Sequence, residues 1–413
     1  MEQERAGDVA GENAVAFMAE VIESLASLSR LPTSPGERKA ADMIRGRFAD
    51  AGCTALVEEV PAYSSYARPI GLLCAVAAAA GLLAGQGRDR GPGLSLAGRA
   101  IGAVGGAAAA YGIMDDITGG RLLARRLLMR HGTTSNVLAE AGDPAASRTL
   151  VVLVHHDAAP SGLVFGQYLE RWLVTRHPEV VESINSNPPL WWAVLAGPVL
   201  VAAGSLLQSS RLRRLGVAGS AISAAALADI ALRPAVPGAN DNLSGVAVAL
   251  AVASALCSAP LSGLRVVFVS AGAEEALQQG IREFARAHFS LLDPEQTWFL
   301  TLDTVGSGNL VLLEGEGTVR MHDYDASFKD LVADCARRAG IPLLRGLRSR
   351  NSTDGSVPQR HGFPTATLVS VSDYKLLPNY HQYSDTPQNV DYRSVTAAAR
   401  LTVAVARRLA TEA

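Results

Sequence analysis

The chain has 413 residues, of which 48% are hydrophobic and only 18% are charged, so it can bury a large core. Its formal net charge of −2 gives no electrostatic basis for binding nucleic acid. The cysteines lie far apart and show no CxxC spacing, which argues against a thiolate metal site and a disulfide framework. Residues 1–13 are acidic and polar, so we expect no cleaved secretory signal.

Two helices and a strand are predicted first. An amphipathic pattern covers roughly Ala14–Leu28. In Ser34-Pro35-Gly36-Glu37, a Ser cap, a Pro at the first helical position and a Glu three residues after the cap predict a second helix to about Ala51. A strand follows at Val57–Val60. We expect residues 14–68 to form the first part of the main domain and to carry no chemistry.

Two apolar segments come next. Ile70–Gly87 contains no charged residue, and Leu94–Met114 contains only Arg99. The short polar stretch Arg88–Gly93 between them is predicted to be a turn. Residues 69–116 are therefore expected to form an apolar helical hairpin.

A second hairpin is predicted over residues 184–232. Ile184–Ser210 is uncharged and includes a tryptophan pair, and Leu215–Leu232 is apolar except for Asp229. The predicted turn between them holds three arginines, Arg211, Arg213 and Arg214. Glycines that recur in these segments imply close helix packing: Gly102, Gly106, Gly197, Gly204, Gly216 and Gly219.

Segments of about 20 apolar residues match the thickness of a bilayer core, and a tryptophan pair suits its interface. The sequence therefore predicts an integral, multi-pass membrane protein with four spans. The alternative is an alanine-rich bundle of a soluble protein or a dimer interface, because two spans are short and Arg99 and Asp229 lie inside the apolar runs. Arginines flank the spans on both sides, so the missing signal peptide alone favours a cytoplasmic location for the large polar domain.

Strands and helices alternate in the rest of the chain. Strands are predicted at 136–140, 149–154, 264–270, 297–302, 310–313 and 365–371, and helices at 241–257, 277–288, 326–339 and 392–409. This order predicts an α/β fold with a mostly parallel or mixed central sheet covered by helices on both faces. We expect one domain that continues over 131–180 and 233–413.

Polar residues cluster where these strands end, which is where open α/β sheets place their sites. They are His155-His156-Asp157, Glu274-Glu275, Asp303 and, late in the chain, His381 with Asp385-Thr386. The turn Pro237–Val246 adds Asp241 directly before a helix, where, taken alone, Asp241 or Asn242 would most simply be a helix cap. Carboxylates and neutral imidazoles are ligands that zinc accepts, so together these residues indicate a metal site.

In this order the motifs resemble the M28 family of zinc aminopeptidases, which are co-catalytic di-zinc exopeptidases with an α/β core. The matching motifs are His155-His156-Asp157, Gly238-Ala239-Asn240-Asp241-Asn242-Leu243-Ser244-Gly245, Glu274-Glu275, Leu302-Asp303-Thr304-Val305-Gly306, and His381 with Asp385-Thr386. The resemblance covers the amino-terminal helices and everything after about Thr134, excluding the hairpins. It implies a metalloprotease that hydrolyses amino-terminal peptide bonds.

The resemblance also implies a role for each residue. Asp241 would bridge two zinc ions, His155 and Asp303 would complete one site, and Glu275 and His381 the other. Glu274 would be the general base, and Asp157 would orient His155. Two ions sharing a carboxylate are suited to activating water and polarising a carbonyl, and a glutamate beside a ligand can move the proton.

Neighbouring residues refine this expectation. Successive residues at a strand end point to opposite sides, so His156 should face away from the metals. Either Tyr374 or Tyr380 could donate a hydrogen bond to a developing oxyanion. The family's pattern is altered at Ala276–Gly280 and only partly met at Ser352–Gly355, so an aminoacyl amide or a modified amino acid is also a possible substrate.

Two other functions are compatible with parts of this pattern. A glutaminyl-cyclase-like acyltransferase would use a single zinc on the same residues. A non-enzymatic membrane interaction protein of the same fold would need none of the five ligands and no Glu274. We therefore expect a membrane-associated hydrolase acting on peptide or aminoacyl substrates, and a homo-oligomeric assembly is compatible with this sequence.

Overall fold

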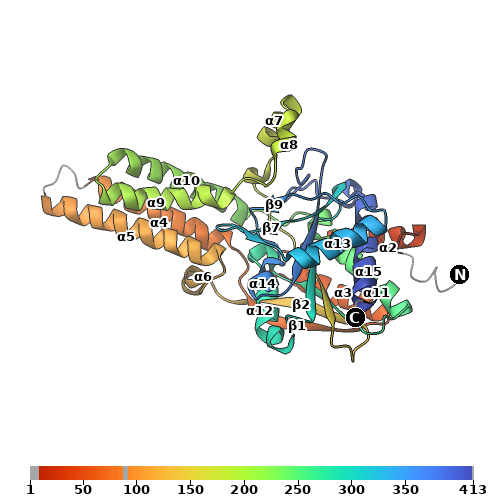
Figure 1. The fold of residues 1–413 in the computed structure, drawn as a ribbon. Coiled ribbons are helices and arrows are strands. Elements are labelled where there is room, and N and C mark those ends of the chain that lie inside the picture. Colours follow the sequence, from red (N-terminus) through yellow and green to blue (C-terminus); the bar gives the residue numbers. More distant parts are fainter. Residues whose placement is uncertain (1–8, 87–91, 412–413) are drawn as a thin grey trace.

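The computed structural model describes residues 9–86 and 92–411. A seven-stranded mixed sheet with the order β1-β2-β4-β3-β5-β10-β6 forms its centre (Figure 1). The strands are β1 Thr54–Ala62, β2 Gly132–Gly142, β3 Thr149–His155, β4 Arg265–Ala271, β5 Thr297–Leu302, β6 Asn309–Leu312 and β10 Thr365–Val371. The four neighbours β4, β3, β5 and β10 are parallel, and β1, β2 and β6 are antiparallel to their neighbours. The predicted α/β fold is thus confirmed.

Helices cover both faces of the sheet. They are α2 Glu12–Ala26, α3 Pro35–Asp50, α11 Ser244–Ser258, α12 Gln279–His288, α13 Ala326–Arg338, α14 Ser356–Arg360 and α15 Tyr392–Thr411. Alternate residues of β3 show the two layers, because Val152 belongs to the core beneath α2, α11 and α15, whereas Val151 belongs to the core beneath α12. Every residue of β3 is buried, as expected for a central strand covered on both faces.

Several short elements had no counterpart in the sequence prediction. They are α6 Leu123–Leu128, η2 Leu163–Phe165, α7 Tyr168–Arg176, α8 Glu179–Ser183 and a small sheet of β7 Gly315–Glu316, β8 His322–Asp323 and β9 Arg348–Ser349. The helix expected from Leu277 begins at Gln279, because Glu274–Ala276 forms a 3-10 turn and Leu277 and Gln278 have positive φ.

Four helices form a bundle that extends away from the sheet (Figure 1). They are α4 Ala67–Gln86, α5 Pro92–Ile117, α9 Leu190–Leu206 and α10 Ser210–Leu232. By length and composition, α4, Leu96–Ile117 and α10 could cross a membrane, whereas α9 has only 17 residues. A fourth helix of that kind, Ala239–Ser258, is largely buried and belongs to the core against the sheet.

The predicted hairpin turns have different outcomes. Residues 88–91 of the first predicted turn lie outside the described residues. The prediction that Arg211, Arg213 and Arg214 form the turn of the second hairpin was wrong, because these residues lie in the amino-terminal part of helix α10. The Ser209 side chain accepts a hydrogen bond from Leu212 N–H and so starts the helix before the arginines.

Glycine allows the close helix packing in the bundle. A Cβ added to Gly216 would lie 2.5 Å from the backbone nitrogen of Val201, and one on Gly106 would lie 2.7 Å from that of Ala202. Large apolar side chains face outward, including Val76 at 53%, Val104 at 68% and Ile222 at 70% exposure. The bundle is therefore tightly packed inside and apolar outside.

All four cysteines are free thiols, but two of them lie in contact. The Sγ atoms of Cys53 and Cys257 are 2.8 Å apart, although 204 residues separate them in sequence. Spacing alone could not reveal this contact, because it depends on how α11 packs beside the end of α3.

Candidate metal centre

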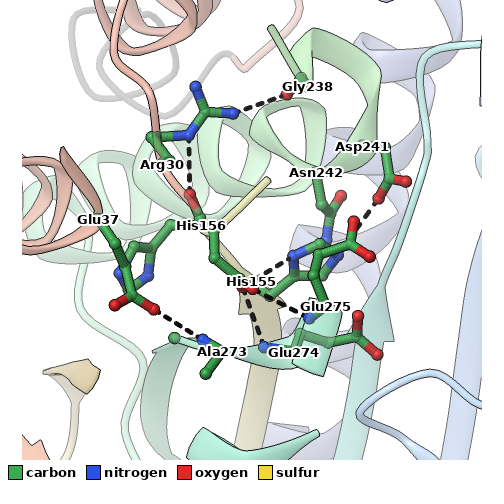
Figure 2. A network of polar contacts seen from close by, with 12 residues as sticks. Arg30, Glu37, His155, His156, Gly238, Asp241, Asn242, Ala273, Glu274 and Glu275 are labelled. Atoms are coloured by element: carbon green, nitrogen blue, oxygen red, sulfur yellow. Dashed lines mark hydrogen bonds and ion pairs between the residues drawn. The ribbon is translucent and has the colours of Figure 1, made fainter. Parts of the chain in front are cut away.

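Four of the predicted site residues, His155, Asp241, Glu274 and Glu275, lie together near the carboxyl ends of central strands (Figure 2). His155 ends β3, Glu274 and Glu275 follow β4, and Asp303 follows β5. His155, Asp241 and Glu275 are buried and offer ligand atoms that all lie within 4.8 Å of one another. Asp303 and His381 are not members of that three-residue group.

The Asp241 carboxylate lies between two imidazoles. Its Oδ1 is 3.3 Å from His155 Nε2, and its Oδ2 is 3.2 Å from His381 Nε2. His381 Nε2 is also 3.2 Å from Glu275 Oε2. One carboxylate therefore faces nitrogen donors from two distant segments, with a second carboxylate beside one of them.

Asp241 is not the cap of the following helix. It has non-helical φ and ψ of −108° and 90°, Leu243 is the N-cap residue of α11, and the Gly245 N–H of the first turn donates to Asn242 Oδ1 at 3.2 Å. The Asp241 N–H donates to Asp385 Oδ2 at 3.1 Å, and the Asn240 N–H donates to Asp385 Oδ1 at 2.8 Å. Asp385 thus holds the backbone of the turn, and the Asp241 carboxylate is turned toward the two imidazoles.

Asp157 connects two strand ends. Its Oδ1 accepts from Glu274 N–H at 3.0 Å and its Oδ2 from Glu275 N–H at 2.9 Å. Oδ1 also lies 3.4 Å from His155 Nδ1. Asp157 is fully buried, holds the backbone of the Glu-Glu pair and lies beside one imidazole.

The electrostatics of the site are dominated by buried carboxylates. Burial raises the pKa of Asp303 to about 7; the charge of His155 lowers it, and that of Asp241 raises it further. Burial also holds the pKa of Glu274 well above its usual range. The charge of His155 acts in the opposite direction on Glu274, while the charge of Asp354 adds to the increase.

These side chains fit a bound cation. Asp241 Oδ2 and Glu275 Oε1 are buried and make no hydrogen bond. Burial lowers the pKa of His381, but the carboxylates of Glu275 and Asp241 more than compensate and raise it to about 10. A positive charge bound among these side chains would therefore be stabilised by the buried carboxylates. The imidazole nitrogens and carboxylate oxygens are also the ligand types that zinc accepts.

His156, Tyr374 and Tyr380 differ in their positions relative to the candidate metal ligands. His156 Nδ1 lies 3.0 Å from Ser270 Oγ, and burial lowers the pKa of this imidazole to about 4. The Tyr380 ring stacks on His381 with 3.8 Å between centroids, whereas Tyr374 is 44% exposed. Of the two tyrosines, it is Tyr380 that lies beside the metal-site residues.

The remaining histidines have partners elsewhere or lie on the surface. His131 pairs with Tyr63, His288 with Glu58, His177 with Glu179 and His361 with the Val357 carbonyl, while His322 is exposed in β8.

The expectation that residues 14–68 carry no chemistry needs correction at two residues. Arg30 is fully buried and donates from Nε to the His156 carbonyl at 2.8 Å and from Nη2 to the Gly238 carbonyl at 3.1 Å (Figure 2). Glu37 accepts from Ala273 N–H at 2.8 Å. Arg30 therefore joins the end of β3 to the Asp241 turn, and Glu37 holds the residue before Glu274. Isolated charged residues in sequence give no signal of such long-range contacts.

A further acidic residue was missed in the partly matching Ser352–Gly355 segment. Asp354 is 1% exposed, and neither carboxylate oxygen makes a hydrogen bond. Burial raises its pKa well above the usual range; the charge of His155 lowers it and that of Asp157 raises it. Asp354 therefore interacts electrostatically with the site residues His155 and Asp157. The sequence pattern indicated only the segment Ser352–Gly355, not this residue.

Residues 225–406 match the model of peptidase family M28. Among curated proteins, the comparison gives no match.

Solved structures share the fold at low sequence identity. An aminopeptidase from Aneurinibacillus sp. strain AM-1 has a TM-score of 0.54 and 15% identity, over 98% of this chain and 95% of that chain. A zinc aminopeptidase from Bacillus subtilis has a TM-score of 0.52 and 14% identity, over 95% and 94% of the two chains. A glutaminyl cyclase from Bacteroides thetaiotaomicron, bound to N-acetylhistamine, has a TM-score of 0.56 and 12% identity, over 97% and 98%.

These likenesses establish the fold, and the family match covers the segment that begins in α10 and runs through the Asp241 turn to α15. The candidate metal-site residues Asp241, Glu274, Glu275, Asp303 and His381 all lie inside the segment that matches peptidase family M28, whereas His155 and Asp157 precede it.

Proposed function

We propose that this protein is a di-zinc aminopeptidase that hydrolyses amino-terminal peptide bonds or aminoacyl amides. The observation that carries the proposal is the position of Asp241, whose two oxygens face His155 Nε2 at 3.3 Å and His381 Nε2 at 3.2 Å. A carboxylate with a separate nitrogen donor on each oxygen suits a ligand shared by two metal ions.

The proposed ligands divide into two sets around Asp241. His155 and Asp303 would hold one zinc ion, and Glu275 and His381 the other. When bound, the ions supply Lewis acidity toward the attacking water and the scissile carbonyl. The chain contributes the rigidity of these ligands, since Asp157 and Arg30 fix their backbone segments.

Glu274 is the proposed general base. Its backbone is held by Asp157, and burial raises the proton affinity of its carboxylate. The carboxylate would take a proton from the attacking water and deliver it to the leaving amine. The Tyr380 hydroxyl, beside His381, is the proposed donor to the developing oxyanion.

Metal content and one conservative variant test this proposal. Purified protein should bind two zinc ions per chain and cleave aminoacyl anilides. Glu274→Gln should lower kcat by about 10²- to 10⁴-fold while both zinc ions are retained, because it removes only the proton acceptor. The exposed Glu295→Gln serves as the control and should leave kcat and zinc content unchanged.

A glutaminyl-cyclase-like acyltransferase is the second candidate, favoured by the fold shared with the Bacteroides thetaiotaomicron enzyme. One zinc ion per chain, ammonia release from peptides with amino-terminal glutamine and no anilide hydrolysis would replace the first proposal with this one.

We also propose that the bundle spans a membrane and that the peptidase domain lies on its cytoplasmic side. Support comes from the outward-facing apolar residues of α4, α5 and α10. The proposed division is a peptidase domain of 14–68, 131–180 and 233–413, with inserted hairpins at 69–116 and 184–232. Recovery in the soluble fraction without detergent would contradict membrane insertion, and protease accessibility in sealed vesicles tests the side.

A further inference from the structure

A cavity beside the metal centre opens at the root of the bundle. It has a volume of about 260 Å³ and reaches the ligand candidate Glu275. Its wall includes Tyr66 and Arg68 at the start of α4, and Ile230 and Arg233 at the end of α10. These are the positions where the proposed membrane helices join the sheet domain, so a substrate using this cavity passes along the base of the bundle.

A second segment connects the bundle with the metal centre. We name residues 162–176 the interface arm; it contains η2 and α7. Its Leu163 N–H donates to Asp229 Oδ2 of α10 at 2.7 Å. Its Phe165 carbonyl accepts from Gln382 Nε2 at 3.0 Å, and the Phe165 ring meets the His381 ring edge-on with 4.5 Å between centroids. The arm therefore contacts the base of α10 and a proposed zinc ligand.

The interface arm exposes an unusual number of large apolar side chains. Leu163 is 77% exposed, Tyr168 87%, Leu169 70% and Trp172 59%. α7 projects from the body near the end of the bundle that meets the sheet domain (Figure 1). A helix that shows Trp, Tyr and Leu to its surroundings has the composition of an element lying in a membrane interface.

The position of the arm in the chain points to a bilayer as the occupant of this surface. α8 ends at Ser183, and α9 enters the bundle at Leu190, so α7 and α8 directly precede a bundle helix. The charged residues of α7 and α8 are nearly balanced: Glu170, Arg171, Arg176, Glu179 and Glu182. Attraction to the arm should therefore come from apolar burial rather than from anionic lipids.

We propose that the interface arm lies in the surface layer of the membrane that the bundle spans, and that the substrates are peptides whose amino termini lie at this surface. The inference rests on the proposed aminopeptidase function and on insertion of the bundle. A peptide bound with its terminal amine near Glu275 leaves the cavity between the bases of α4 and α10. Anchoring the arm in the surface layer would hold the opening of the cavity at the depth of the membrane surface, where the amino termini of membrane-bound peptides lie.

The position of the arm is tested without any substrate. The full chain, reconstituted in phosphatidylcholine vesicles with and without brominated acyl chains, is compared with Trp172→Phe by tryptophan fluorescence. If Trp172 lies in the bilayer, its removal lowers the fraction of the fluorescence that bromine quenches. If Trp172 lies in water, its removal raises that fraction, because an unquenched tryptophan has been lost, and the proposal fails.

The substrate class is tested with two substrates that share the same amino-terminal residue. One is a soluble aminoacyl anilide, and the other is a peptide held in the vesicles by a carboxyl-terminal acyl chain. The variant Leu169→Glu/Trp172→Glu should lose about tenfold in kcat/KM on the anchored peptide and keep its rate on the anilide. Leu291→Glu, which replaces a 78% exposed leucine on the sheet domain, is the matched control and should alter neither rate.

The possible failures are distinguishable. If the zinc-loaded wild-type protein hydrolyses neither substrate, the proposed function fails, whatever the quenching shows. If it hydrolyses both but the arm variant changes both rates equally or neither, the inference about membrane-bound substrates is overturned while the aminopeptidase proposal stands.

Discussion

At the scale of single residues, the candidate site depends on buried side chains that each hold more than one segment. Asp157 accepts from two successive backbone N–H groups and lies against His155, and Arg30 joins the carbonyl groups of His156 and Gly238. Charge-assisted hydrogen bonds of this kind are stronger than neutral ones, and they fix geometry as well as energy. Small changes at such residues should therefore affect metal binding before they affect the fold.

Asp157→Asn is expected to weaken zinc affinity by about 10- to 100-fold, measured by competition with a chelator. The new amide would turn an NH₂ group toward the N–H of Glu274 or Glu275, where an acceptor is needed. The matched control is Asp143→Asn, since Asp143 also accepts from two backbone N–H groups but lies in a loop away from the site. Equal loss of zinc affinity in both variants would contradict a specific role for Asp157.

Glu316 should make stability depend on pH. Burial raises its pKa to about 7, and hydrogen bonds from Thr353 lower it only partly. The folded state therefore binds a proton that the unfolded state releases from about pH 4.5 upward, so the stabilisation is complete below that pH and is lost as pH rises through about 7.

The variant Glu316→Gln should remove this dependence. As the pH rises from 5 to 8, the thermal unfolding midpoint of the wild type should fall relative to that of Glu316→Gln. The corresponding loss in the free energy of unfolding is about 3 kcal/mol at most. The exposed Glu295→Gln is the control and should follow the wild type. Parallel curves for wild type and Glu316→Gln would rule out a raised pKa at Glu316.

At the scale of elements, the bundle shows how small residues decide helix contacts. Gly216 and Gly219 lie on the same helix, α10, but only Gly216 meets backbone at close range. A Cβ on Gly219 would meet its nearest atom, Gly197 Cα, at 3.6 Å, which is an ordinary contact. Alanine substitutions at Gly216 and Gly219 therefore separate two effects: steric overpacking against α9 at Gly216, and the gain in helix propensity at Gly219.

Gly216→Ala should lower the thermal unfolding midpoint in detergent, because overpacking costs about 1 to 3 kcal/mol. Gly219→Ala should leave the midpoint unchanged or raise it, since alanine favours a helix over glycine by up to about 1 kcal/mol. The same midpoint for both variants would mean that α9 and α10 do not pack as closely as described.

Element boundaries also show where local sequence signals compete. The run of Arg211, Arg213 and Arg214 suggested a turn, but the Ser209 cap starts α10 before it. Likewise, Ser34 caps α3 as predicted, by accepting from Glu37 N–H, whereas the Glu37 carboxylate reaches Thr33 and Ala273 instead of completing the local capping box. A cap is local and can be predicted, but the partner of a buried carboxylate depends on the strands packed against it.

At the scale of the whole molecule, the parallel strands β4, β3 and β5 explain why motifs spread over the chain meet. Their carboxyl ends lie at the same edge of the sheet, where His155, Glu275 and Asp303 follow them. Both hairpins are inserted in connections on that sheet, and α10 leads within a few residues into the Asp241 turn. The cavity at Glu275 consequently has the base of the bundle as one wall.

The sequence by itself determined the α/β fold class, the order of the strands along the chain and the residue types of the candidate site. Hydrophobic periodicity and strand-end motifs are local, so one sequence suffices to see them. Only the tertiary structure decided that Arg30, Glu37 and Asp354 lie at the site, and that the interface arm joins the bundle to His381. Those relations arise from packing between segments far apart in sequence, where burial creates charge coupling that no local pattern records.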